Sequence, residues 1–384
     1  MGESTGMSTA PIPPLDPSLV PHLIRSSRLA PVTDLQGRSA IRLSRGIYWE
    51  PDPRAQGWQH RHTLCLARAK AAHLSHTGSY LSHTSAALWL GLAQYSQQPD
   101  VYLAVGSRPT HMPLPVVEFT ASGEPFASAH PRFDRQLTLW RRGLDLHRDE
   151  LVVANGLPMT SPLRTAFDCA CDEPALNALS IADSALRLVC RPDRRHPTDA
   201  TAPWAQAIRV WDELIARHPR RRGIAQARAI LAAASPWAES VLESATRWLL
   251  HAIGAEPPHL QHQISLGTGP AWVDLCWPQY QLIIEVDGRV KYASRQDAWK
   301  EKHRQDAIHE LGWTFLRLSS SDLARPEALA MRIRQAFPPT AVASFAPRPE
   351  FLRPGAALAD GLDAASALSR PRSQPRSRSQ PQRA

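Results

Sequence analysis

Two short strands and the turn between them decide how the C-terminal part of this chain folds: residues 272–288 read WVDLCW, PQY and QLIIEVDG. Both runs are rich in β-branched and aromatic residues, and a proline-containing turn separates them, which predicts a β-hairpin. A turn centred between Gln279 and Tyr280 places Asp274 opposite Glu285. The hairpin therefore brings two carboxylates side by side.

Side chains of a strand alternate between its two faces, so Asp274, Glu285 and Asp287 share one face of the hairpin. The other face is apolar and is formed by Val273, Leu275, Leu282, Ile284 and Val286. Opposed carboxylates lie about 5 Å apart and repel each other, so a face of three acids favours a bound cation. Oxygen ligands suit Mg²⁺ or Mn²⁺, and we expect these three acids to hold such an ion. The alternative is a solvent-exposed face whose acids bind nothing.

Length and charge restrict the class of protein. The 384 residues are enough for two or three domains, and the net charge of +9 favours an anionic partner, nucleic acid first. Part of this excess lies in residues 370–384, which hold five arginines and no acid. We expect disorder over residues 1–16 and over the basic tail 341–384. The tail either adds nonspecific affinity for phosphates or is simply a soluble end.

Cysteine usage and hydropathy point to a reducing compartment. The five cysteines form no CxxC pair and are odd in number, which argues against structural zinc and a disulfide framework. The first 20 residues contain no apolar core of the kind found in signal peptides, and no apolar run approaches the length of a membrane span. We expect a soluble, cytoplasmic protein that makes no membrane contact.

Residues 17–60 have the outline of a small winged helix. A helical stretch is expected over 19–26, and the basic segment 38–46 leads into a strand-like Ile47–Trp49. The arginines of this segment would face DNA phosphates from a wing or from the preceding helix. They are Arg38, Arg42 and Arg45. The alternative is that these arginines are scattered over the surface around a turn.

Residues 61–190 are expected to form a mixed α+β region. One capped helix begins near Ser82 and ends at Gly91, and a second carries Pro162 in its first turn. Strands are expected at 101–105 and 116–120. Three histidines fit no recognised metal-ligand spacing, so we expect them to cap and pack: His73, His76 and His83.

The segment 191–234 combines a polar linker with a helical hairpin. Its arginine-rich loop 218–222 is expected to be solvated, although it could touch a DNA backbone. Residues 235–340 then form a last domain, whose first helix is expected to begin at Ser235 and end near Gly254. The strands and helices that follow give the order αβββαβα, with elements at about 260–266, 271–277, 281–287, 294–311, 313–318 and 326–337.

This order, with carboxylates on the second and third strands, resembles the restriction-endonuclease-like PD-(D/E)xK fold. Residues 235–337 are similar to the actinobacterial domain family related to very-short-patch-repair (Vsr) endonucleases. The similarity lies in several segments that recur in order, at 239–244, 273–274, 285–292, 301–306 and 312–317.

The resemblance implies a hydrolytic metal site. In nucleases of this fold the Asp and the Glu hold a divalent ion, which polarises the scissile phosphate and helps to generate hydroxide from water. A lysine two positions after the Glu commonly assists, and Asp287 stands there in this chain. Lys291 or Lys302 could take the place of that lysine. Glu243 matches the first-helix acid of the fold, and the alternative is that it is a helix-surface glutamate.

The N-terminal 190 residues resemble, more weakly, the AbiEi-type antitoxins of type IV toxin–antitoxin systems. The matching segments lie at 45–48, 82–87 and 160–168. This resemblance implies a winged-helix DNA-binding module, and whether a toxin partner exists is not readable from it.

We therefore expect an α/β multidomain protein that has a winged-helix-like module, an α+β middle region and an endonuclease-like αβββαβ domain. The expected function is DNA binding with Mg²⁺-dependent endonuclease activity. The alternative is a non-catalytic regulator, similar to an antitoxin, that uses the nuclease fold only for binding. The retained acids favour the enzyme, and the missing lysine favours the regulator.

Overall fold

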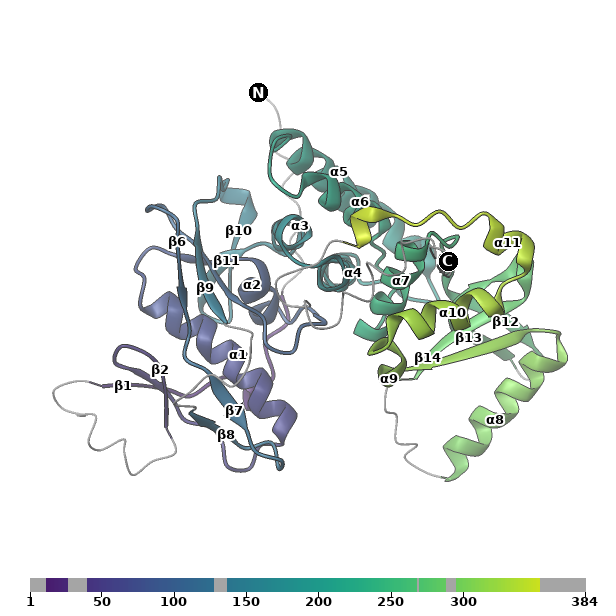
Figure 1. Ribbon diagram of the computed structural model, residues 1–384, viewed down its shortest axis with the longest axis horizontal. Coiled ribbons are helices and arrows are strands. Elements are labelled where there is room, and N and C mark those ends of the chain that lie inside the picture. Colours follow the sequence, from purple (N-terminus) through teal and green to yellow (C-terminus); the bar gives the residue numbers. More distant parts are fainter. Residues whose placement is uncertain (1–11, 27–39, 128–136, 268, 288–294, 353–384) are drawn as a thin grey trace, which may run out of the picture.

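The computed structural model describes residues 12–26, 40–127, 137–267, 269–287 and 295–352. The molecule is a mixed α/β protein, and these described residues form four sheets. Two bodies built on sheets lie on either side of a central group of helices (Figure 1). The expected disorder at 1–16 and 341–384 falls largely outside the described residues. Part of that expected tail is ordered, because α11 (Pro339–Ala343) and a 3₁₀ turn (Pro349–Phe351) bury Phe351 completely.

The chain begins with a three-stranded antiparallel sheet in the order β1-β3-β2. Its strands are β1 (Leu23–Arg25), β2 (Ile41–Ser44) and β3 (Ile47–Trp49). The expected basic hairpin is therefore present, and it turns at Gly46, whose φ of +73° favours glycine. The helical stretch expected over 19–26 is wrong. Main-chain pairing with β3 holds residues 23–25 in an extended strand instead.

Helix α1 (Gly57–Leu74) packs against this sheet and follows it in the chain. Leu64, Ala67 and Ala71 of the helix form a small core with Trp49 and its neighbours on the strands. Among the described residues no α-helix precedes the hairpin, so the order is sheet and then helix. The helices that a winged helix places before its wing are not found in the described part of residues 17–60.

The middle region is a six-stranded mixed sheet in the order β10-β11-β4-β5-β9-β6. Its strands are β4 (Tyr80–Leu81), β5 (Val101–Ala104), β6 (Thr110–Pro113), β9 (Thr138–Arg142), β10 (Leu151–Ala154) and β11 (Leu157–Thr160). A separate pair comprises β7 (Val117–Phe119) and β8 (Pro125–Ala127). Helices α2 (His83–Trp89), α3 (Pro162–Asp172) and α4 (Ala175–Cys190) complete the region. The expected strands at 101–105 and 116–120 and both expected helices are confirmed.

Helices α5 (Thr201–Arg217) and α6 (Ile224–Ala233) match the expected helical hairpin. They are part of the main core, since Trp211 and Ile230 are almost fully buried in the same apolar cluster as α4 and α7 (Val241–Ile253). Figure 1 shows these helices between the two sheet-containing bodies. One hydrophobic core therefore continues across the expected domain boundaries at 190 and 235.

The C-terminal part has the expected order αβββαβα, with one additional short helix. After α7 come β12 (His259–Leu266), β13 (Gly269–Trp277), β14 (Leu282–Asp287), α8 (Arg295–Glu310), β15 (Thr314–Ser319), α9 (Ser320–Leu323) and α10 (Pro326–Ala336). The sheet order is β12-β13-β14-β15, and β15 runs parallel to β14. Helix α7 begins five residues later than expected, because Ser240, and not Ser235, is its N-cap and accepts a hydrogen bond from the Glu243 N–H.

The predicted hairpin register is confirmed. Leu275 pairs with Ile284, and Trp277 pairs with Leu282, as this register requires, but the regular pairs end at Leu275 and do not include the expected pair of Asp274 with Glu285. The predicted alternation fails at Asp274. Val273 belongs to the core cluster that includes Ile308 of α8, whereas Leu275 belongs to the main core. The strand is therefore irregular at the residue of greatest interest.

Both faces of the hairpin are covered. Ile283 lies with Ile308 of α8 on one side, and Ile284 lies in the main core on the other. Glu285, on the α8 side, is only 8% exposed. The alternative of a solvent-exposed acid is therefore wrong for Glu285, whereas Asp274 is half-buried and the burial of Asp287 lies outside the described side chains. Within the described ranges no helix combines the length and the apolar character needed to cross a membrane.

Candidate functional site

The candidate site lies where the pairing of β13 and β14 ends. The last regular pair is Leu275–Ile284, and beyond it the carboxylate of Asp274 accepts a hydrogen bond from the backbone N–H of Val286 at 3.1 Å. A side chain thus accepts a hydrogen bond from the neighbouring strand at the point where main-chain pairing stops. This bond holds Asp274 between the two strands. Burial raises the pKa of Asp274, and the hydrogen bond from Val286 only partly offsets the effect.

Glu243 approaches the same place from the first turn of α7. Its carboxylate accepts hydrogen bonds from the Glu239 backbone N–H at 3.0 Å and from Gln261 Nε2 at 3.3 Å. Glu243 is 5% exposed, so the alternative of a helix-surface glutamate is wrong. Burial, and then the negative charge of Asp274, raise its pKa to about 7. Glu243 is therefore partly protonated near neutral pH.

Glu285 has a cationic partner, Arg304, that was not predicted from the sequence. Arg304 of α8 places Nη2 2.7 Å from Glu285 Oε1, and the same nitrogen lies 2.6 Å from Glu301 Oε1. Arg317 of β15 is more distant, at 3.8 Å from Glu285 Oε2. Burial still raises the pKa of Glu285, although Arg304 lowers it and Asp274 adds a further increase.

The other predicted site residues are not brought to these acids. Lys302 is exposed on α8. It lies about 200° around the helix from Arg304, because successive residues are separated by about 100°. Arg42 and Arg45 are exposed on the N-terminal hairpin. The predictions for Arg38 and Lys291 fall on residues outside the described ranges, and the side chain of Asp287 is likewise not described.

The acids fit a hard cation by chemistry, but the described side chains do not yet form a complete metal site. Among the side chains that the structure describes, no three His, Cys, Asp or Glu residues gather closely enough to hold a metal ion. The carboxylates of Asp274 and Glu285 also have different hydrogen-bond partners. Yet burial raises the pKa of Asp274, Glu285 and Glu243, so their negative charge is not fully compensated by the protein. A divalent cation with carboxylate ligands would compensate it.

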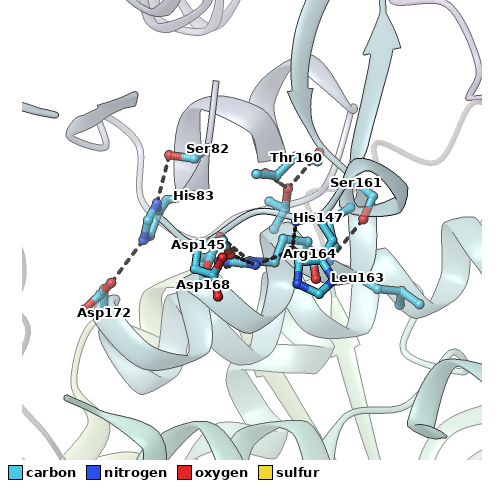
Figure 2. A network of polar contacts seen from close by, with 12 residues as sticks. Ser82, His83, Asp145, His147, Thr160, Ser161, Leu163, Arg164, Asp168 and Asp172 are labelled. Atoms are coloured by element: carbon cyan, nitrogen blue, oxygen red, sulfur yellow. Dashed lines mark hydrogen bonds and ion pairs between the residues drawn. The ribbon is translucent and has the colours of Figure 1, made fainter. Parts of the chain in front are cut away.

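A second polar cluster lies in the middle region and is built on Arg164 of α3 (Figure 2). This guanidinium is 1% exposed, donates from Nε to both oxygens of Asp168 at 3.1 Å, and also binds Glu150. Arg221 and Arg217 complete it, since they bind Asp168 and Glu150, respectively. Burial raises the pKa of Asp168, but the charges of the two neighbouring arginines outweigh this effect and leave it below its ordinary value.

The network continues to α2 through a buried histidine. His83 lies between the Ser82 hydroxyl and the Asp172 carboxylate, at 3.0 Å from each (Figure 2). Asp172 also accepts from Arg221 at 3.0 Å. His83 therefore packs and bonds as expected. The expectation of a solvated arginine loop is wrong for Arg221, which binds Asp168 and Asp172, and is confirmed for Arg220 and Arg222, which are exposed.

Similarity to known proteins leaves the chemistry open. No protein-family model matches the chain, and no solved structure does. Two curated proteins of Mycobacterium tuberculosis, the uncharacterized proteins MT2308 and Rv2248, are each 32% identical to it over 181 residues. These matches cover 47% of this chain and 61% of each relative. The chain thus spans about three fifths of the length of these relatives, whose printed names state no activity.

Proposed function

We propose that this chain is a DNA-binding protein whose C-terminal domain hydrolyses phosphodiester bonds with the help of Mg²⁺ or Mn²⁺. The supporting observation is the group of three carboxylates where β13 and β14 separate: Glu243 and Glu285 are buried, Asp274 is half-buried, and all three have raised pKa values. Removing an acid from water without enough compensating charge is unfavourable, so neighbouring acids whose pKa values are raised favour a ligand that carries positive charge. The resemblance to the Vsr-related family of the PD-(D/E)xK fold agrees with this proposal.

Asp274 and Glu285 would hold the ion, with Asp287 as a supporting acid. A bound divalent ion would polarise the scissile phosphate and lower the pKa of water. Glu243, with a pKa of about 7, is suited to accept or return a proton near neutral pH. Arg317 is partly exposed near Glu285 and is placed to approach a phosphate oxygen. Lys291 stays a candidate for the water-side cation.

The DNA-binding part of the proposal rests on the N-terminal hairpin. Arg25, Arg42 and Arg45 line a groove of about 950 Å³ between this hairpin, α1 and β6, and no Asp or Glu is among its described lining residues. A surface with arginines and no acids attracts phosphates without reading sequence. Winged-helix and antitoxin-like character stay part of the proposal, and a toxin partner is not required by it.

A non-catalytic regulator is the second candidate, and one observation favours it. Arg304 already supplies a positive charge to Glu285, at 2.7 Å. A permanent ion pair at that position would leave a fold that binds DNA and cuts nothing. The missing lysine two positions after Glu285 agrees with this candidate.

A cleavage assay separates the two candidates. Purified full-length protein is incubated with supercoiled, linear, mismatched and single-stranded DNA, with EDTA, Mg²⁺ or Mn²⁺. We expect metal-dependent cleavage that Asp274→Ala and Glu285→Ala abolish, because each removes a ligand of the same ion. Arg332→Ala, which removes a surface ion pair of the same domain, is the matched control and should cut normally.

DNA binding is measured in parallel in EDTA. Asp274→Ala and Glu285→Ala should bind DNA as the wild type does, while Arg42→Ala and Arg45→Ala should each reduce the salt dependence of log Kd by about 0.9 on duplex DNA. Wild-type protein that binds DNA and metal yet cuts no substrate would favour the regulator. Cleavage that survives Glu285→Ala would show that the site lies elsewhere.

A further inference from the structure

A small pocket beside Asp274 has a composition suited to a nucleotide. It has a volume of about 350 Å³ and is lined by Pro192, Asp193, Arg194, Arg195, Glu239 and Trp272. The first four lining residues belong to the segment between α4 and α5, and Trp272 belongs to β13. A stretch with the composition of a linker therefore forms one wall of a pocket in the endonuclease-like domain.

The pocket adjoins the candidate metal ligand. Trp272 precedes Asp274 by two residues on β13, a separation of roughly 7 Å along a strand. Electrostatics agrees with this placement. The negative charge of Glu239 raises the pKa of Asp274, and the positive charge of Arg194 lowers it. Both lining residues are therefore close enough to Asp274 to affect its ionisation.

The acids of the pocket already have cationic or hydrogen-bonding partners, so they do not repel a phosphate strongly. Glu239 binds Arg194 through both carboxylate oxygens and also binds Arg187. Asp193 accepts from the Arg195 backbone N–H and from His196. Arg195 itself is exposed, and within the described part of the chain no ion pair of its guanidinium with an acid is found. One arginine is thus available for an anion.

Trp272 supplies an aromatic surface on which a base can stack. Its indole is half-buried and lines the pocket. Bases of single-stranded DNA stack on exposed aromatic faces, whereas the bases of a duplex are stacked on each other and expose no such face. A pocket of this size lies at the small end of ligand sites, which suits one nucleotide better than a base pair.

We propose that Trp272 and Arg195 form a subsite for one unpaired nucleotide of single-stranded DNA, beside the phosphate that the acids would act on. The role of this subsite in cleavage rests on the proposed function, and the subsite names the substrate class of that function as single-stranded DNA. Trp272 stacks on the base, Arg195 binds the adjoining phosphate, and the ion pair of Arg194 with Glu239 fixes the wall between them. Double-stranded DNA enters the subsite only where a base has left the helix.

The test measures binding without catalysis. Fluorescence anisotropy of a labelled 12-nucleotide oligo-dT is recorded in EDTA with the full chain carrying Arg42→Ala and Arg45→Ala, so that the N-terminal hairpin contributes little. Trp272→Ala should weaken binding on the order of tenfold, and Trp272→Phe should restore most of it. Arg195→Ala should lower the slope of log Kd against log salt by about 0.7. Binding of a duplex of equal length should not change.

Two matched controls come from the same domain. Trp299 is 63% exposed on α8, and Arg325 is exposed before α10; neither lines the pocket. Trp299→Ala and Arg325→Ala should bind oligo-dT like the parent. Equal losses in Trp272→Ala and Trp299→Ala, or equal losses on single strands and duplex, would overturn the inference. An oligo-rU arm reports whether RNA binds more tightly, which would also overturn it. If Trp272→Ala weakens binding but no DNA is ever cut, the subsite stands and the nuclease proposal fails.

Discussion

Two groups of acids in the described structure are treated in opposite ways. In the network around Arg164, three arginines bind three acids. The pKa of Asp168 therefore ends below its ordinary value despite complete burial. Where β13 and β14 separate, burial dominates, and the pKa values of Glu243, Asp274 and Glu285 are all raised.

This difference separates a structural cluster from a candidate site. The Arg164 network is internally neutralised, so removing a member leaves a charge without a partner and affects folding first. The acid group keeps unfavourable negative charge, so removing a member relieves repulsion and affects ligand binding first. Both contain Asp, Glu and Arg, and residue type alone does not distinguish them.

Arg164→Ala should have the largest effect on stability. It leaves Asp168 and Glu150 buried with one cationic partner fewer, which costs about 3–5 kcal/mol for a broken buried pair. Urea or guanidinium unfolding monitored by circular dichroism measures the loss. The control is Arg332→Ala, whose ion pair with Asp322 is partly exposed and should contribute about 1 kcal/mol or less. A loss as small as that of the control would remove the contrast between the two regions.

Glu243→Gln should change how stability depends on pH. Its pKa is raised from 4.5 to about 7 on folding, so the folded state binds more protons between these values. The free energy of unfolding therefore falls as pH rises from 4.5 to 7, by roughly 3 kcal/mol for this group. Unfolding curves at pH 4.5, 6 and 8 should show a shallower fall in the variant. If the free energy of unfolding depended on pH equally in the two proteins, the pKa of Glu243 would not be raised in the folded state.

Divalent metal should stabilise the acid group and leave the Arg164 network unaffected. At a Mn²⁺ concentration 100 times Kd, binding to the folded state alone adds about 2.7 kcal/mol. The shift in Tm at pH 8 should disappear in Asp274→Asn and persist in Arg332→Ala. An equal shift in Asp274→Asn would place the metal somewhere other than between β13 and β14.

Lys302→Ala should have the smallest effect. The residue is exposed and turned away from Arg304 on α8, so we expect a change in stability within about 0.5 kcal/mol and unchanged turnover. A clear loss of turnover would show that α8 rotates when DNA binds.

Much of the C-terminal architecture followed from the sequence because its information is local. The period of two in the hairpin and its proline-containing turn predicted the register that pairs Leu275 with Ile284, which is a property of neighbouring residues. Pro162 likewise marked the start of α3, where the hydroxyl of the preceding Ser161 accepts from the Arg164 N–H. Element order and register are predictable to this extent.

The rest depends on contacts between distant residues. Arg304 and Glu285 are 19 positions apart, and Arg221 and Asp168 are 53 apart, so no spacing rule joins them. The start of β1 was misjudged because pairing with Trp49 outweighs the helical preference of its neighbours. The break in alternation at Asp274 arises where Asp274 replaces a main-chain acceptor, which a binary pattern does not encode.

The segment that ends at Phe351 determines when the molecule can finish folding. Phe351 is fully buried in the main core, and its carbonyl accepts from Trp248 Nε1 at 2.7 Å. Trp248 lies on α7, the helix that carries Glu243. On the ribosome, where chains grow at about 5–20 residues per second, this helix therefore lacks a packing partner until Phe351 has been made. The helix that carries Glu243 thus completes its packing in a late step, and a nascent chain that lacks Phe351 is not expected to show the proposed cleavage.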